Sequence, residues 1–160
     1  MNSTRNDMKA TLRGQMVDLL NVSLAELIDL SLQTKQAHWN VKGPEFIALH
    51  KLFDELTDSL HGLGDTVAER ITALGGTALG TTQNVAETSE LTPYPVKIKG
   101  GAQHVKALTM AFATCGARVR KAIDVAAKAG DAGTTDVFTE VSRALDKQLW
   151  FIEAHTQAKD

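Results

Sequence analysis

The sequence predicts an all-α fold built as a bundle of four long helices. Apolar residues recur at helical spacing through most of the chain, and prolines interrupt it only at Pro44, Pro93 and Pro95. No segment shows the strict apolar–polar alternation that is typical of a half-buried strand. A hydrophobic content of 43% with 22% charged residues is typical of globular proteins, and 160 residues suit one domain.

The first two predicted helices form an antiparallel pair around a sharp turn. The first runs from about Thr11 to Trp39, and the turn Gly43-Pro44 ends it. Pro44 and Glu45 suit the first turn of the second helix, which stops at Gly75-Gly76. The apolar stripe of the first helix is Leu12, Met16, Leu19, Leu20, Leu24, Leu27, Ile28 and Leu32. That of the second is Phe46, Leu49, Phe53, Leu56, Leu60, Leu63, Val67, Ile71 and Leu74.

Residues 75–100 form a long connection to the second half of the chain. Within it, Thr81-Thr82 can cap a short helical turn, and Pro93-Tyr94-Pro95 forces an extended stretch. A third long helix is predicted over 103–129 and a fourth from about 134 to 156.

Four helices joined by short, long and short connections have the ferritin-like connectivity. The predicted fold is therefore a ferritin-like four-helix bundle with a short extra helix in the long crossover connection. It occupies residues 11–160 and follows a short N-terminal tail, residues 1–10.

Composition excludes several other classes of protein. The formal net charge of -2 gives no whole-chain case for nucleic-acid binding, which needs a concentrated basic surface. Cys115 is the only cysteine, so no internal disulfide can form. The first residues lack the apolar core of a secretion signal, and no apolar run approaches the ~18 residues of a membrane span. We therefore expect a cytoplasmic protein without membrane partners.

One side of the second predicted helix carries many side chains that can bind metal. At about 100° per residue, six of them fall within a sector of roughly 100°. They are His50, Asp54, Asp58, His61, Asp65 and Glu69. His38 lies just before the turn that would fold it back toward His50. Each carboxylate alone could be a solvated surface charge, but aspartate is a poor helix former and histidines share this face, which favours a metal role. Such ligands suit iron, manganese or zinc.

The spacing of these ligands points to a site shared between two subunits. His50 and Asp54 are one turn apart, as are Asp65 and Glu69, but ~22 Å of helix separates the two pairs. They could share a metal ion only if two copies of this helix pack antiparallel about a two-fold axis. A single-chain ferritin site needs Glu-x-x-His on two helices, and the sequence lacks that motif. A structural zinc at the same ligands is the alternative without turnover.

The same antiparallel register has a second consequence at the centre of the dimer. It brings Asp58 of one chain toward His61 of the other, twice. We therefore expect a paired His–Asp contact between the two metal sites; the alternative is that His61 only fills space near the axis.

The residues around these ligands resemble the Dps family, the DNA-binding proteins from starved cells, also called mini-ferritins. The resemblance rests on three stretches: 35–44 (KQAHWNVKGP) continuing to His50, Asp54 and 65–70 (DTVAER); 74–82 (LGGTALGTT); and 142–153 (SRALDKQLWFIE). It implies a hollow homo-dodecamer, built from two-fold dimers, that oxidises ferrous iron preferentially with hydrogen peroxide and stores ferric mineral. It also implies that His38, His50 and Asp54 of one subunit and Asp65 and Glu69 of its mate are the iron ligands.

The resemblance assigns roles to three further residues, each with a simpler alternative. Trp39 would lie beside the iron site and quench radicals, whereas core packing is the alternative. Asp131 and Asp136 would line a three-fold pore, whereas helix capping and dipole compensation explain them equally. Trp150 is expected to pack inside the bundle.

The N-terminus departs from the best-known DNA-binding members of that family, which carry a longer, lysine-rich tail. Here only Arg5, Lys9 and Arg13 precede Gln15, with Asp7 between them. Tight binding requires several phosphate contacts, so weak or undetectable DNA binding is expected. The rival hypothesis is a nucleoid-compacting DNA-binding protein with secondary iron chemistry, which would be nucleoid-associated.

Overall fold

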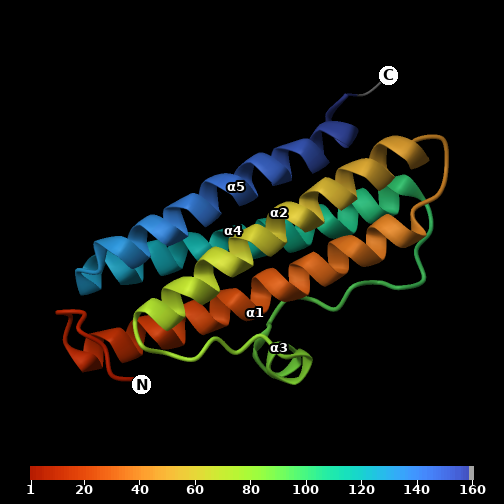
Figure 1. The fold of residues 1–160 in the computed structure, drawn as a ribbon. Coiled ribbons are helices and arrows are strands. Elements are labelled where there is room, and N and C mark those ends of the chain that lie inside the picture. Colours follow the sequence, from red (N-terminus) through yellow and green to blue (C-terminus); the bar gives the residue numbers. More distant parts are fainter. Residues whose placement is uncertain (159–160) are drawn as a thin grey trace.

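Four long helices lie side by side as two antiparallel pairs, and a short helix lies in the crossover between the pairs (Figure 1). The computed structural model describes residues 1–158. Its helices are α1 (Ala10–Asn40), α2 (Phe46–Ala73), α3 (Thr82–Thr88), α4 (Gly101–Ala129) and α5 (Ala132–Gln157). The predicted four-helix bundle with one short crossover helix is confirmed, and only the end of the expected domain, 159–160, lies outside the described residues.

The core is formed by the apolar stripes of the four long helices. Phe53, Phe112 and Phe138, from α2, α4 and α5, are fully buried. Burying one such side chain stabilises a fold by about 1.5–3 kcal/mol, so these rings hold the two helix pairs together. Leu32, predicted on the inner stripe of α1, is instead exposed. The helix turns about 140° between Leu27 and Leu32, which carries Leu32 away from the core.

Glycines end two of the long helices in the same way. Gly75 and Gly130 adopt left-handed backbone angles, with φ of 85° and 81°. The amide of Gly76 donates to the carbonyl of Ile71, and the amide of Asp131 donates to that of Ala126. These are the bonds of the Schellman motif, which satisfies the last carbonyl groups of a helix. The predicted stops at Gly75-Gly76 and Gly130 therefore have a physical cause.

Helix starts differ slightly from the sequence prediction. Pro44 and Glu45 form a turn before α2, and α2 begins only at Phe46, whose amide donates to the carbonyl of Gly43. The last helix begins at Ala132, two residues before the predicted Thr134, because Asp131 caps it. None of the helices described in residues 1–158 is long and apolar enough to cross a membrane.

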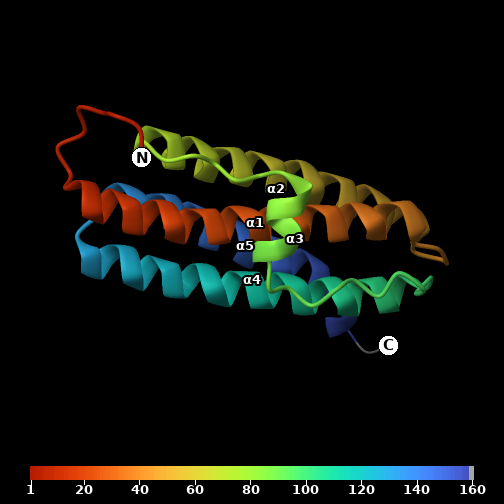
Figure 2. The ribbon, with the colours of Figure 1, turned by 90° about the horizontal axis from the view of Figure 1, so that it is seen from below.

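The N-terminal segment folds back against the end of α2. Figure 2 shows the N-terminus beside the C-terminal end of that helix. The amide of Asn2 donates to the carbonyl of Gly75 at 2.6 Å. The Arg13 guanidinium donates to the carbonyls of Leu74 (2.8 Å) and Met8 (3.3 Å). The tail is thereby tied at both ends to the body of the bundle.

Candidate metal centre

Two histidines from adjacent helices fix each other's orientation near the short loop that joins α1 to α2. Their rings stack with centroids 3.8 Å apart. Nδ1 of His38 lies 2.7 Å from the carbonyl oxygen of His50, and Nδ1 of His50 lies 2.9 Å from the carbonyl oxygen of His38. Because a carbonyl can only accept, each Nδ1 carries a proton, and in the neutral form of each imidazole the lone pair is therefore on Nε2. Both histidines are thus in the tautomer that binds metal through Nε2.

Asp54 adds a carboxylate to the two imidazoles. One turn after His50 on α2, its Oδ1 lies 3.9 Å from Nε2 of His38. Lys35 of α1 forms an ion pair with the same carboxylate. The hydrogen bond from Lys35 holds the pKa of Asp54 below its ordinary value, so this group is an anion at neutral pH. The structure therefore brings His38, His50 and Asp54 together, and it adds Lys35, which the sequence analysis did not single out.

Asp65 and Glu69 lie far from this cluster within one chain. Both are exposed, and neither side chain makes a hydrogen bond or ion pair within residues 1–158. At 1.5 Å per residue, ~22 Å of α2 separates their midpoint from that of His50 and Asp54. Among the described residues, no group of three or more histidine, cysteine or acidic side chains is arranged to hold a metal ion. Within one chain the predicted metal ligands therefore fall into two separate groups.

Trp39 does not pack in the core. It follows His38 directly at the end of α1 and is 66% exposed. The core-packing alternative is therefore not what the chain adopts. Trp150 is also exposed, at 58%, so the expectation that it packs inside the bundle is wrong. It lies about 200° around α5 from the inward-facing Gln148, on the opposite side of the helix.

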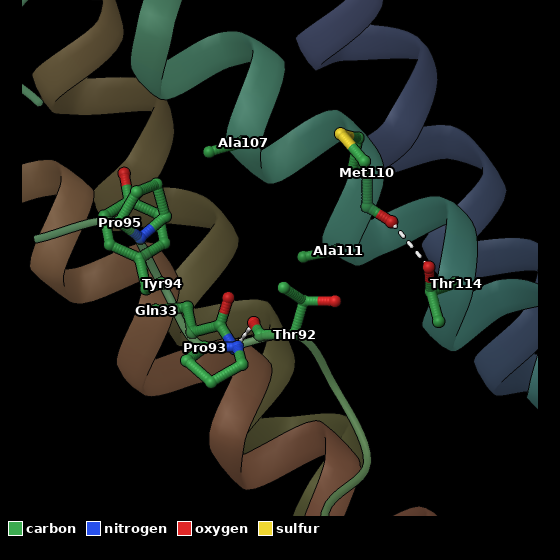
Figure 3. A pocket seen from close by; sticks show the side chains of 9 residues that line it. All are labelled: Gln33, Thr92, Pro93, Tyr94, Pro95, Ala107, Met110, Ala111 and Thr114. Carbon is green, nitrogen blue, oxygen red and sulfur yellow. Dashed lines mark hydrogen bonds between the residues drawn. The ribbon is translucent and has the colours of Figure 1, made fainter.

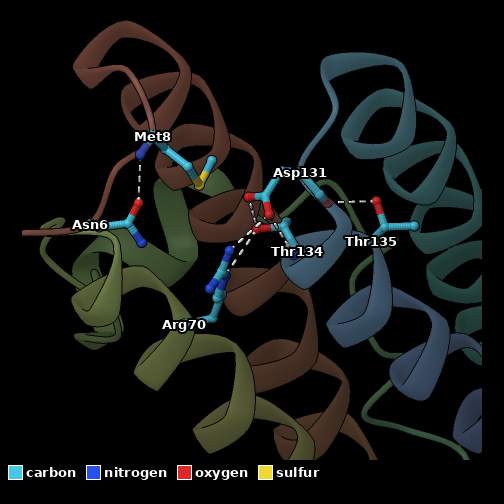
Figure 4. A network of polar contacts seen from close by, with 6 residues as sticks. All are labelled: Asn6, Met8, Arg70, Asp131, Thr134 and Thr135. Carbon is cyan, nitrogen blue, oxygen red and sulfur yellow. Dashed lines mark hydrogen bonds and ion pairs between the residues drawn. The ribbon is translucent and has the colours of Figure 1, made fainter.

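Asp131 forms hydrogen bonds at the start of α5 (Figure 4). It is only 4% exposed, and it accepts hydrogen bonds from the amide and hydroxyl of Thr134 and from the Arg70 guanidinium at 2.8 Å. Burial alone would raise the pKa of Asp131, but the hydrogen bonds from Thr134 and the nearby Arg70 outweigh it and lower the pKa. Asp131 is thus a helix cap paired with α2, whereas Asp136 is exposed. The pore role of both stays a prediction.

A pocket lies between the crossover and α4 (Figure 3). This pocket of about 240 Å³ is lined mainly by Pro93, Pro95, Ala107 and Met110. No histidine, cysteine or carboxylate lines it, so it offers no set of metal ligands. Tyr94, at its edge, is hydrogen-bonded to buried His104, which joins the crossover to α4.

Comparison with known proteins agrees with this architecture. The family model of the ferritin-like domain matches residues 17–159, so the chain is a ferritin-like protein. Within that class it belongs to the Dps family, the DNA protection during starvation proteins. The protein of that name from Agrobacterium fabrum is 49% identical over 156 residues, covering 98% of this chain and 96% of the relative. That from Brevibacillus brevis is 31% identical, covering 92% and 98%.

Solved structures support the same assignment. Mycobacterium smegmatis Dps has a TM-score of 0.93 at 29% identity, covering 98% of this chain and 96% of that one. DpsA14 from Streptomyces coelicolor has a TM-score of 0.92 at 33% identity, covering 97% and 92%. The family resemblance noted in the sequence is therefore confirmed, as is the ferritin-like fold.

Proposed function

We propose that this protein oxidises ferrous iron, preferentially with hydrogen peroxide, at sites shared between two subunits, and stores the ferric product inside a hollow dodecamer. The observation that carries the proposal is the position of two groups of side chains that can bind metal, one toward each end of α2. His38, His50 and Asp54 lie close together, while Asp65 and Glu69 lie toward the other end of α2 without a side-chain partner in the described residues. Membership of the Dps family supports iron handling as their common purpose.

Antiparallel packing of two α2 helices would complete both half-sites at once. In that arrangement His50 and Asp54 face the partner's Glu69 and Asp65, and a two-fold axis creates the second site automatically. Each site then contains two imidazoles and three carboxylates. Carboxylates are hard, anionic ligands and stabilise ferric over ferrous iron, which favours oxidation at the site.

The chemistry balances with two ferrous ions for each peroxide. Each Fe²⁺ gives one electron, the O–O bond breaks, and two protons complete two water molecules, so no hydroxyl radical is released. The protein holds the ions together so that both electrons arrive in one event. Lys35 opposes occupancy of the Asp54 side, because its ammonium group already pairs with that carboxylate. Iron must displace or share this partner.

Trp39 and Asp136 have supporting roles in this proposal. Trp39 adjoins a ligand and its indole is accessible, so it can give an electron to a stray oxidant before the oxidant escapes. Asp136 is an exposed carboxylate in the first turns of α5, and a ring of such groups around a three-fold axis would concentrate ferrous ions at an entrance.

The residues before α1 carry few of the cationic side chains that the rival function, DNA compaction, needs. Arg5 and Lys9 are the only basic side chains before α1, and the segment that carries them is bonded to Gly75 and Arg13. Nonspecific binding depends on the number of phosphates that cationic side chains neutralise, and this tail offers few.

Removal of the carboxylates of Asp65 and Glu69 tests the proposed activity. Protein loaded anaerobically with Fe²⁺ and then given peroxide should develop the ultraviolet absorbance of ferric iron. A variant with Asp65→Ala and Glu69→Ala should lose this rapid phase but keep its helicity. The matched control, Asp124→Ala with Glu140→Ala, removes two exposed carboxylates from α4 and α5 and should retain the wild-type rate. Equal rates in both variants would contradict the proposal, and tight Zn²⁺ binding by a wild type without turnover would favour a structural zinc.

A further inference from the structure

Two polar side chains occupy the centre of the outer face of α2 without a partner. Asp58 and His61 are exposed, and neither makes a hydrogen bond or ion pair within residues 1–158. Asp58 follows Asp54 by one turn, and His61 precedes Asp65 by one turn. The four residues therefore form a continuous stripe, because positions three and four apart are neighbours on a helix surface.

A groove beside this stripe indicates that the face is covered in the assembled protein. It has a volume of about 300 Å³, lies between α1 and α2, and is lined by Ile28, Leu60, Gly64, His61 and Asp65 among others. The hydroxyl of Ser31 also lines it, is 2% exposed, and has no hydrogen-bond partner in the described chain. Leu32, which follows Ile28 by one turn of α1, is an exposed apolar side chain. Apolar walls of this kind are typical of a surface that a partner covers.

We propose that a second copy of this chain covers the face and that Asp58 pairs with the partner's His61 on each side of the two-fold axis. The inference rests on the proposed function, because the shared iron site sets the register. With Asp54 opposite the partner's Asp65, and His50 opposite the partner's Glu69, an antiparallel helix places Asp58 opposite the partner's His61. The two contacts then lie between the two iron sites.

The charges on this face determine what a second copy must supply. Asp54, Asp58, Asp65 and Glu69 give each chain four carboxylates on the face that meets its own copy. Juxtaposed like charges oppose association, so this interface needs compensating donors. His61 is the donor at its centre: an imidazole N–H can donate to the carboxylate of Asp58 across the axis. Iron compensates the outer carboxylates, and the His–Asp pairs compensate the inner ones.

The pair is assigned a positioning role, because neither residue reaches the iron. A slip of one residue along α2 would move every ligand by 1.5 Å relative to the other half-site. Metal–ligand distances tolerate only ~0.2 Å. Two symmetric contacts on either side of the axis fix this register, and they do so without using the ligands themselves.

Exchange of the two residues gives a direct test. Asp58→His places two imidazoles opposite each other, and His61→Asp places two carboxylates opposite each other. The double variant Asp58→His with His61→Asp restores the pair with its ends exchanged. Subunit association by light scattering over a dilution series and the single-turnover oxidation rate are measured for all four proteins, with helicity as the folding control.

We expect each single variant to lose roughly tenfold in association or in rate, and the double variant to recover most of that loss, as coupled neighbours do. Single variants equal to the wild type, or a double variant as defective as the singles, would overturn the pairing. A wild type that associates but does not oxidise iron would refute the proposed function, and the association data would still test the Asp58–His61 pairing. If the variants do not fold, a crystal structure of the wild type decides: a separation above about 8 Å between Asp58 and the partner's His61 is too long even for one bridging water.

Discussion

Complementation between two inactive variants tests whether the iron site crosses the subunit boundary. One variant carries His50→Ala and Asp54→Ala, and the other carries Asp65→Ala and Glu69→Ala. Each alone destroys every site, because each site needs one pair from each subunit. A two-fold dimer that contains one chain of each variant has one site with all the ligands and one site with neither pair.

The expected recovery follows from the geometry of α2. Because ~22 Å of helix separates the two pairs, no chain can supply both to one ion. If the variants co-assemble at random, half the dimers are mixed and each has one complete site, so about a quarter of wild-type sites should be restored. Co-expressed variants with different affinity tags allow mixed oligomers to be isolated, and stopped-flow absorbance after peroxide addition measures the fast phase. Separately purified and then blended variants serve as the control for subunit exchange.

No recovery in verified mixed oligomers would refute the shared site, because the complete ligand set would then be present without activity. Activity in either pure variant would refute it in another way, because half the proposed ligands would then be dispensable.

Three further outcomes are expected. Lys35→Met should let the pKa of Asp54 rise toward its ordinary value and strengthen anaerobic Fe²⁺ binding several-fold, as measured by calorimetry. Lys35→Arg keeps the charge and should not change the affinity. Equal affinities in both variants would show that Lys35 does not act at the site. Asp131→Ala should lower the free energy of unfolding at neutral pH by about 2–3 kcal/mol through loss of the cap and of the Arg70 pair, as measured by denaturant titration. Folding lowers the pKa of Asp131, so its contribution to the free energy of unfolding is complete above the unfolded pKa of about 4 and is lost as pH falls further. The difference in stability between the variant and the wild type should therefore shrink in acid. A difference that does not depend on pH would contradict this cause. Linear DNA should show no retarded complex at ~150 mM salt, and a complex that disappears on deletion of residues 1–10 would show that Arg5 and Lys9 suffice.

The helices could be predicted because their signals are local. Gly75 and Gly130 mark helix ends through backbone angles that other residues avoid, and the inner stripes recur at helical spacing. Convergence of His38 and His50 was also predictable, since one short turn joins their helices. The exposure of Trp150 could have been found as well, because its angle around the helix places it opposite the inward stripe.

Contacts between distant segments were not predictable in the same way. Arg70 and Asp131 are 61 positions apart, and only the packing of α5 against the end of α2 brings them together. The sequence therefore left capping and pore roles for Asp131 equally open. Lys35 was missed although a signal existed: it precedes His38 by three residues and so shares its face of α1. The partner's half of the iron site could be inferred only from spacing, because no single chain contains it.

The reciprocal hydrogen bonds of His38 and His50 make these two residues one functional unit. Each ring is oriented by the backbone carbonyl of the other residue, so an alanine substitution at one position removes a stacking partner but leaves the carbonyl that orients the other ring. Any coupling between alanine substitutions at the two positions should therefore measure the loss of the ring stacking, because the orienting carbonyls remain. The pair also couples ligand orientation to the spacing between α1 and α2. Any designed or natural variant that repacks these helices must adjust both histidines together, and they are best transplanted to another scaffold as one module with both helix segments.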